Sequence, residues 1–286
     1  MWESAEEPMS AIGTSTTRSR AHGRLNQVGT LSREQPVSWE VSSPHLDRGV
    51  VMAENAVRKR ELASCLRSYS RAFDKVEKDP DDLGDAPNPV KLTFTRFPKN
   101  SRLNEIALKV SVMNQWWTTN LKGEEQLWAF SRRVLNLTGF DQRVISKQLD
   151  LDLVQQLAKP TDSETCWFSA ATKYCYLSRC MTNPTLLEYP LFDSFSELAV
   201  YTISKHFNLT PETGVQRITH PSLRDAHRWR RVLDNLLREL ELEWGYRKLD
   251  KSLYELGFML DFDRRGTKEW KEATRERGCE PPLWFR

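Results

Sequence analysis

Apolar side chains recur every three to four residues through most of the sequence after residue 52, a spacing typical of one buried face of an α-helix. The clearest stripe lies between Leu223 and Trp244. Another helix begins at Asp193, where Ser194 and Glu197 stand at the spacing of a capping box. The same reasoning predicts helices over 53–78, over 103–117, after Gly123, over 142–159, from about 162 to 182, and over 249–256, where Gly257 ends the last of them.

Four segments lack this helical spacing. Residues 1–51 are rich in Ser, Thr, Arg, Gly and Pro, a composition that predicts a disordered N-terminal extension. Residues 79–89 read DPDDLGDAPNP and predict a loop, and 90–97 alternate weakly and predict an extended segment. Residues 263–286 form a charged C-terminal tail. The fold class is therefore mainly α, with one helical domain over 52–262.

Composition and charge narrow the classes of function. The net charge of +3 permits nucleic acid as a partner without requiring it. The five cysteines form no CxxC pair, so we expect reduced thiols in a cytoplasmic protein and no zinc or iron–sulfur site. No apolar run approaches the ~20 residues that cross a bilayer. The first 30 residues carry three glutamates and no hydrophobic stretch, so we expect no secretory signal.

One lysine and one aspartate stand out because their local sequence gives each a chemical use. Lys173 falls at the border of the apolar face of the helix over 162–182. Partial desolvation there favours the neutral, nucleophilic form of an amine. Asp193 follows two proline-containing turns and begins a new helix, whose N-terminal amides and dipole stabilise a carboxylate. The spacing thus predicts an amine and a fixed carboxylate on two adjacent helices. If both act on one sugar, as the resemblance described next implies, their polar atoms should lie within about 8 Å of each other in one cleft.

The segment over 163–198 resembles the core of helix-hairpin-helix DNA glycosylases, in particular the 8-oxoguanine DNA glycosylase branch and a divergent bacterial group related to it. In that family a hairpin leads into a lysine, here Ala171-Thr172-Lys173. An aspartate follows a short proline-containing strand, here Pro190-Leu191-Phe192-Asp193. Further on, Arg247, Asp250 and Leu253–Gly257 look like the closing segment of the bacterial group. The resemblance covers about 36 residues well and extends loosely over a longer stretch.

The resemblance implies a function and a role for each matched residue. Lys173 would attack the anomeric carbon of a flipped-out nucleotide, expel the base and form a Schiff base that permits strand cleavage. Asp193 would stabilise positive charge on the sugar and move a proton. The implied activity is that of a DNA glycosylase with AP-lyase activity in base-excision DNA repair, that is, a hydrolase or lyase. No metal ion or cofactor is required.

The sequence departs from the family pattern at the hairpin. A Gly-x-Gly turn normally precedes the lysine, and its amides grip a DNA phosphate; here the corresponding residues 168–172 contain no glycine. The hydroxyls of Ser169 and Thr172 are candidates for phosphate contacts in its place, together with Arg247. Trp116 and Trp117 are candidates for a wall against which a base stacks.

Each of these residues also has a purely structural explanation. A lysine on a helix is usually a solvated surface charge, an aspartate at a helix start is usually a cap, and a tryptophan pair is usually interhelical packing. The expected partner is double-stranded DNA with a flipped base, bound by a monomer. Two alternatives stay open: a catalytically inactive nucleic-acid-binding protein of the same fold, and a helical interaction protein with no nucleic-acid role.

Overall fold

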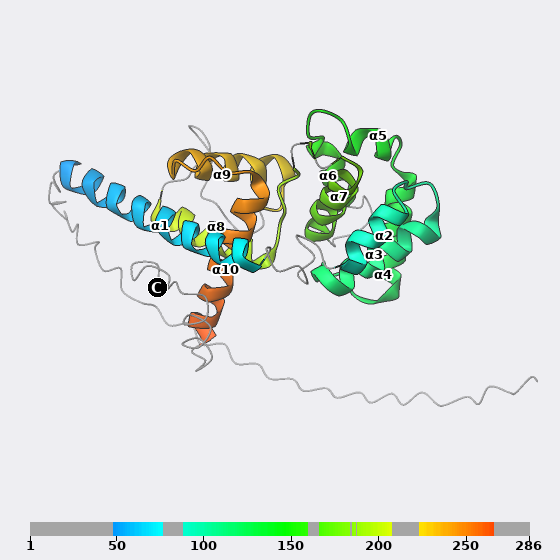
Figure 1. The fold of residues 1–286 in the computed structure, drawn as a ribbon, viewed down its shortest axis with the longest axis horizontal. Coiled ribbons are helices and arrows are strands. Elements are labelled where there is room, and N and C mark those ends of the chain that lie inside the picture. Colours follow the sequence, from blue (N-terminus) through cyan, green and yellow to red (C-terminus); the bar gives the residue numbers. More distant parts are fainter. Residues whose placement is uncertain are drawn as a thin grey trace, which may run out of the picture. The chain divides into compact units, whose positions relative to one another are not determined.

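The computed structural model describes residues 48–76, 88–159, 166–183, 185–186, 188–207 and 223–265. These residues form ten helices and no β-strand, so the mainly α fold class that the periodicity predicted is confirmed (Figure 1). The helices are α1 (Arg48–Val76), α2 (Asn88–Arg96), α3 (Leu103–Trp117), α4 (Gly123–Asn136), α5 (Phe140–Val144), α6 (Leu151–Ala158), α7 (Phe168–Thr182), α8 (Ser194–His206), α9 (Ala226–Glu239) and α10 (Tyr246–Arg265).

The first two helices correct the predicted boundaries. Residues 48–51, assigned to the disordered extension, already belong to α1; residues 1–47 of that extension and 266–286 of the predicted tail lie outside the described residues. The segment predicted as extended is the helix α2. Val90 and Phe94 stand four residues apart and are both buried, so they pack as one helical face. The prediction of an extended segment over 90–97 was therefore wrong, because it depended on a weak alternation.

The predicted helix over 142–159 is two helices, α5 and α6. Between them the guanidinium of Arg179, which is fully buried, donates to the carbonyl oxygens of Val144 at 2.6 Å and Ser146 at 2.7 Å. These two carbonyl oxygens therefore accept hydrogen bonds from a side chain of α7. Helix α6 then begins at a separate N-cap. The carboxylate of Asp150 accepts there from the Leu153 amide. The break between α5 and α6 thus coincides with hydrogen bonds from a buried arginine of α7.

The last helix also differs from the prediction, because α10 continues through Gly257 to Arg265. Gly257 lies against the backbone of α8, and a Cβ atom at this position would lie 1.9 Å from the Phe195 carbonyl oxygen. The glycine is therefore a point of close helix approach and not a helix end. Asp193 occupies the predicted position before α8, and its side chain accepts from the Phe195 amide at 3.0 Å.

One hydrophobic cluster contains side chains from all ten described helices. Helices α2 to α7 contact one another in a group, and α10 packs on α1, α8 and α9; α6 also contacts α9 (Figure 1). The segment after α7 carries Tyr189 to Phe192, all buried, from the first group to the second. This segment ends at Asp193, so the packing of Leu191 and Phe192 fixes where α8 begins relative to α7.

Candidate functional site

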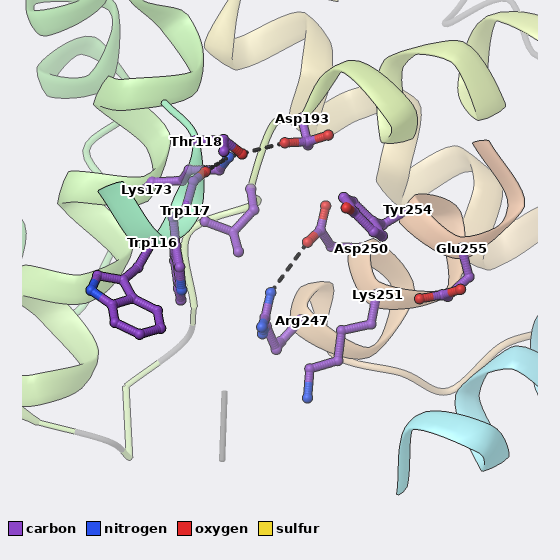
Figure 2. A pocket seen from close by; sticks show the side chains of 11 residues that line it. Trp116, Trp117, Thr118, Lys173, Asp193, Arg247, Asp250, Lys251, Tyr254 and Glu255 are labelled. Carbon is purple, nitrogen blue, oxygen red and sulfur yellow. Dashed lines mark hydrogen bonds and ion pairs between the residues drawn. The ribbon is translucent and has the colours of Figure 1, made fainter. Parts of the chain in front are cut away.

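Lys173 and Asp193 form an ion pair. The Nζ atom of Lys173 lies 3.0 Å from Oδ2 of Asp193, and the two side chains are 7% and 14% exposed (Figure 2). The two groups were predicted to lie within about 8 Å of each other, and the structure confirms this prediction. The burial of Lys173 is greater than predicted, because a position at the border of the helix face is covered by the C-terminal end of α3.

A second acceptor holds the lysine in place. Lys173 Nζ donates to the backbone carbonyl of Trp117 at 2.7 Å. Trp117 is the last residue of α3, and the next residue, Thr118, has a left-handed backbone with φ of 42°. This conformation is unfavourable for a β-branched residue. Strained backbone is thus found directly after the carbonyl that binds Lys173, a location where strain often accompanies function.

The pair lies in the wall of a pocket of about 280 Å³, near the lower end of the size range of ligand pockets in proteins. Three separate parts of the chain form it: the end of α3, the α7 to α8 region and α10 (Figure 2). The lining residues are Trp116, Trp117, Thr118, Lys173, Leu191, Asp193, Arg247, Asp250, Lys251, Tyr254 and Glu255. The pocket therefore combines aromatic surface with three basic and three acidic side chains.

Arg247 is held on several sides within this pocket. Its guanidinium lies 5.5 Å from the ring centre of Trp117 and 5.7 Å from that of Tyr176. One of its terminal nitrogens lies 3.3 Å from Oδ2 of Asp250. Its backbone amide donates to the Glu188 carboxylate at 3.0 Å. These contacts, from α3, α7, α10 and the segment before α8, fix the direction of the guanidinium.

Asp250 links the arginine to the start of α8. Its Oδ1 accepts from the hydroxyl of Ser196 at 2.9 Å, and its Oδ2 faces Arg247. Burial raises the pKa of the Asp250 carboxyl, whereas the positive charge of Arg247 and the Ser196 hydrogen bond act in the opposite direction. Both carboxyl oxygens are thus occupied by partners within the protein.

The structure brings five of the seven predicted site residues to the pocket: Trp116, Trp117, Lys173, Asp193 and Arg247. Trp116 is 54% exposed, so its indole is available to a ligand. Ser169 and Thr172 do not line the pocket. They lie in the first two turns of α7, which is helical where the sequence suggested a hairpin turn.

Thr172 is not available to a DNA phosphate in this conformation. The side chain is 2% exposed, its hydroxyl donates to the Ser169 carbonyl at 3.1 Å, and it accepts from the Phe192 amide at 3.2 Å. Thr172 instead connects α7 to the segment that leads to Asp193, so its contacts position the ion pair. The Ser169 hydroxyl oxygen is buried and has no hydrogen-bond partner among the described residues.

Sequence reasoning assigned no role to most of the pocket residues of α10. Arg247, Asp250, Lys251, Tyr254 and Glu255 follow one another at spacings of three, one, three and one, the repeat of one helical face. That polar stripe was a usable signal. The sequence analysis did not recognise this stripe, because the helix that it predicted, over 249–256, has too few turns to show the repeat.

Across the ranges with described coordinates, no cluster of three or more His, Cys, Asp or Glu residues has an arrangement that could hold a metal ion. None of the helices described above is both long enough and apolar enough to span a bilayer.

Comparison with known proteins identifies one family. The family HI_0787_N, described as an N-terminal domain, matches residues 66–182. The matched segment begins within α1 and ends with α7, so it contains Trp117 and Lys173 but not Asp193 or the pocket residues of α10. It covers less than half of the chain. No curated protein and no solved structure matches the chain significantly.

Proposed function

We propose that this chain is a DNA glycosylase of the helix-hairpin-helix type, which excises a damaged or modified base from double-stranded DNA and has an associated lyase activity. The observation that carries the proposal is the ion pair of Lys173 and Asp193, 3.0 Å apart in the wall of a pocket with exposed aromatic surface. A nucleophilic amine beside a carboxylate is the minimum that such chemistry needs.

The elements before the lysine support the same proposal. Helices α6 and α7 pack against each other and are joined by residues 159–167, and the Trp167 amide donates to the Ala158 carbonyl at 2.8 Å. Two consecutive packed helices with a lysine in the second support the helical arrangement that the resemblance implies, but α7 is already helical over residues 168–172, where the resemblance places the hairpin turn. The twenty residues from Lys173 to Asp193 then return the chain to the same pocket.

The proposed reaction begins with transfer of a proton from the Lys173 ammonium to the Asp193 carboxylate. The neutral amine forms a bond to C1′ of an extruded nucleotide, and the C1′–N glycosidic bond breaks with its electron pair leaving on the base, which takes up a proton. Opening of the sugar ring at the C1′–O bond gives a Schiff base between Lys173 and the deoxyribose. Elimination from that Schiff base cleaves the strand.

One observation favours a different function, that of a nucleic-acid-binding protein without catalysis. The Lys173 ammonium donates to both the Trp117 carbonyl and Asp193, and as an ammonium it has no lone pair for attack on C1′. Catalysis therefore requires the ammonium to transfer a proton when DNA binds. A protein that only binds DNA would keep the ammonium and both contacts.

Borohydride trapping tests the proposal directly. The wild-type protein is incubated with duplexes that contain an abasic site or a candidate damaged base, and sodium borohydride reduces any Schiff base to a stable adduct. We expect an adduct with the wild type, none with Lys173→Gln, and an undiminished adduct with Lys122→Gln, which removes an exposed lysine outside the pocket. If neither abasic DNA nor any damaged base yields product or adduct, the proposal is wrong.

A second result would revise the roles without removing the activity. If Lys173→Gln still releases a base but no longer cuts the strand or forms an adduct, the enzyme is monofunctional. Asp193 then activates water, and Lys173 is an accessory residue. Measuring base release and strand cleavage separately distinguishes these cases.

A further inference from the structure

The α10 side of the pocket presents two cationic side chains. Arg247 and Lys251 stand four residues apart on this helix, and their side chains extend to the same side of the pocket, between Trp116 and Glu255 (Figure 2). Arginine and lysine side chains donate hydrogen bonds and accept none. The two of them therefore form a donor-only part of the wall.

The acidic residue between Arg247 and Lys251 in the sequence has both carboxylate oxygens engaged within the protein. Asp250 lies between the two in sequence, but its Oδ1 accepts from Ser196 and its Oδ2 faces Arg247. Its oxygens are thus used within the wall. Glu255 lies at the opposite side of the pocket from Trp116, beyond Lys251 (Figure 2).

The guanidinium of Arg247 is also fixed in direction. The aromatic rings of Trp117 and Tyr176 lie near it, and these rings are 5.9 Å apart at an angle of 31°. The ion pair with Asp250 restrains the same group from α10 itself. A guanidinium held in this way loses little freedom on binding a ligand, so its planar set of donors can discriminate between ligand edges.

We propose that Arg247, assisted by Lys251, reads the edge of the extruded base and selects a base with an exocyclic oxygen at C4 of a pyrimidine or C6 of a purine over one with an amino group at the same position. The inference rests on the proposed function and specifies its substrate class. An oxygen accepts from the arginine, as the guanine edge does in DNA recognition. An amino group at that position presents a donor to a donor and leaves the partly buried guanidinium with an unmade hydrogen bond.

This inference differs from the phosphate contact expected for Arg247 from the sequence. A phosphate is the same whatever base is attached, so a phosphate contact changes affinity for all substrates equally. An edge-reading contact changes the ratio between substrates. The position of Arg247 in the same pocket as Lys173 favours the second role, because the base attached to the attacked C1′ must lie close by.

Pairs of duplexes that differ in one exocyclic group provide the test. Uracil is compared with cytosine, and hypoxanthine with adenine, each opposite a tetrahydrofuran residue so that base pairing does not contribute. A duplex with tetrahydrofuran in both strands serves as the reference without a base. For the wild type we expect each oxygen-bearing base to bind about tenfold more tightly than its amino partner.

The arginine variants identify the origin of the preference. In Arg247→Gln the amide can donate or accept, so the tenfold ratio should fall below about threefold. Arg247→Lys retains the charge without the planar fork, and its ratio should be intermediate. Arg132→Gln removes an exposed arginine of α4 outside the pocket and should leave the ratio as in the wild type. Thermal unfolding of each variant identifies any that fail to fold, in which case the other variant decides.

The possible failures are distinguishable. A wild-type protein that forms the borohydride adduct on abasic DNA but shows no preference between paired bases overturns this inference alone. The inference is also overturned if Arg247→Gln lowers the affinity for every duplex, including the reference, by the same factor. That result would identify Arg247 as a phosphate contact. Absence of any adduct together with equal affinity for all five duplexes overturns the proposed function and this inference with it.

Discussion

Gly257 of α10 lies so close to Phe195 of α8 that an added Cβ atom would be 1.9 Å from the Phe195 carbonyl oxygen and 2.5 Å from its carbonyl carbon. Because the contact is with backbone, no side-chain rearrangement can relieve it. Phe195 also donates its amide to Asp193. The approach of α10 to α8 therefore determines the position of the candidate carboxylate as well as the packing of the two helices.

The first prediction is that Gly257→Ala destabilises the protein by several kcal/mol. Replacing glycine by alanine in a helix interior usually raises the free energy of unfolding by about 1 kcal/mol. Here the added methyl group would force α8 and α10 apart, which costs more than that gain. Urea unfolding measures the difference. Gly245→Ala is the matched control, because its Cβ would meet only a side-chain oxygen of Glu188 at 3.6 Å. Equal stability of the two variants would contradict the predicted close contact.

Lys173→Gln should lower the free energy of unfolding by about 1–3 kcal/mol. A lysine at the border of a helix face, where the sequence predicted Lys173, would contribute little to stability. The structure buries the side chain and gives its ammonium two acceptors, Trp117 and Asp193. A glutamine amide is shorter and cannot replace both contacts. Lys122→Gln, at an exposed site, should change urea unfolding by less than about 0.5 kcal/mol.

Asp193→Asn should reduce base excision at least about a hundredfold, far more than its loss of stability explains. Asparagine still caps α8, but its amide NH2 then faces the Lys173 ammonium, and the negative charge that would stabilise the sugar cation is gone. Single-turnover excision measures the effect. The control is Asp225→Asn, which alters the equivalent N-cap of α9, where the carboxylate accepts from the Arg228 amide at 2.9 Å. Comparable losses in both variants would identify Asp193 as a cap only.

The stability of the protein should rise between pH 8 and 9 because of Lys109. This side chain is 1% exposed and donates to the Asn100 side chain at 2.6 Å, and burial lowers the pKa of its amine to about 8. The unfolded chain, with an ordinary lysine pKa near 10.4, stays protonated in this window while the native amine loses its proton. Unfolding then takes up a proton, so the free energy of unfolding increases with pH.

Urea unfolding from pH 7.5 to 9 of the wild type and of Lys109→Met measures this increase. The variant lacks the titrating amine and should not show it. The buried thiol of Cys175 acts in the opposite direction within the same window, because burial raises its pKa whereas the unfolded thiol ionises at about pH 8.5. Both proteins contain Cys175, so the difference between their two curves isolates the contribution of Lys109. Parallel curves for the two proteins would show that Lys109 retains an ordinary pKa.

Thr118→Gly should stabilise the protein by about 0.5–1 kcal/mol. The φ of 42° at Thr118 is unfavourable for a β-branched residue and readily adopted by glycine, although the greater freedom of glycine in the unfolded chain offsets part of the gain. Differential scanning calorimetry measures the change. Thr138→Gly, at an exposed position between α4 and α5 with an ordinary negative φ, should lower stability. A loss of stability in Thr118→Gly would show that the left-handed residue is not strained.

The sequence by itself determined which segments are helical wherever the apolar repeat was long. Helices α1, α3, α4 and α7 to α9 occur where the periodicity predicted them, and Asp193 stands at the predicted N-cap. These features depend on contacts within a few residues, which the order of residues along the chain already specifies. The proximity of Lys173 and Asp193 was predicted from the resemblance, which requires both groups to approach one sugar, and the distance of 3.0 Å agrees with it.

Only the tertiary structure decided the features that depend on remote partners. The break between α5 and α6 coincides with carbonyl contacts from Arg179, and the course of α10 through Gly257 depends on α8. The pocket brings the end of α3 to Lys173 of α7, 56 residues further along the chain, and to α10, which is more distant still in the sequence. Such contacts form between segments that are distant in sequence, so local periodicity carries no information about which side chains face one another. For the same physical reason the sequence indicated Lys173 and Asp193 as a candidate pair but not the cationic side chains of α10 in the same pocket.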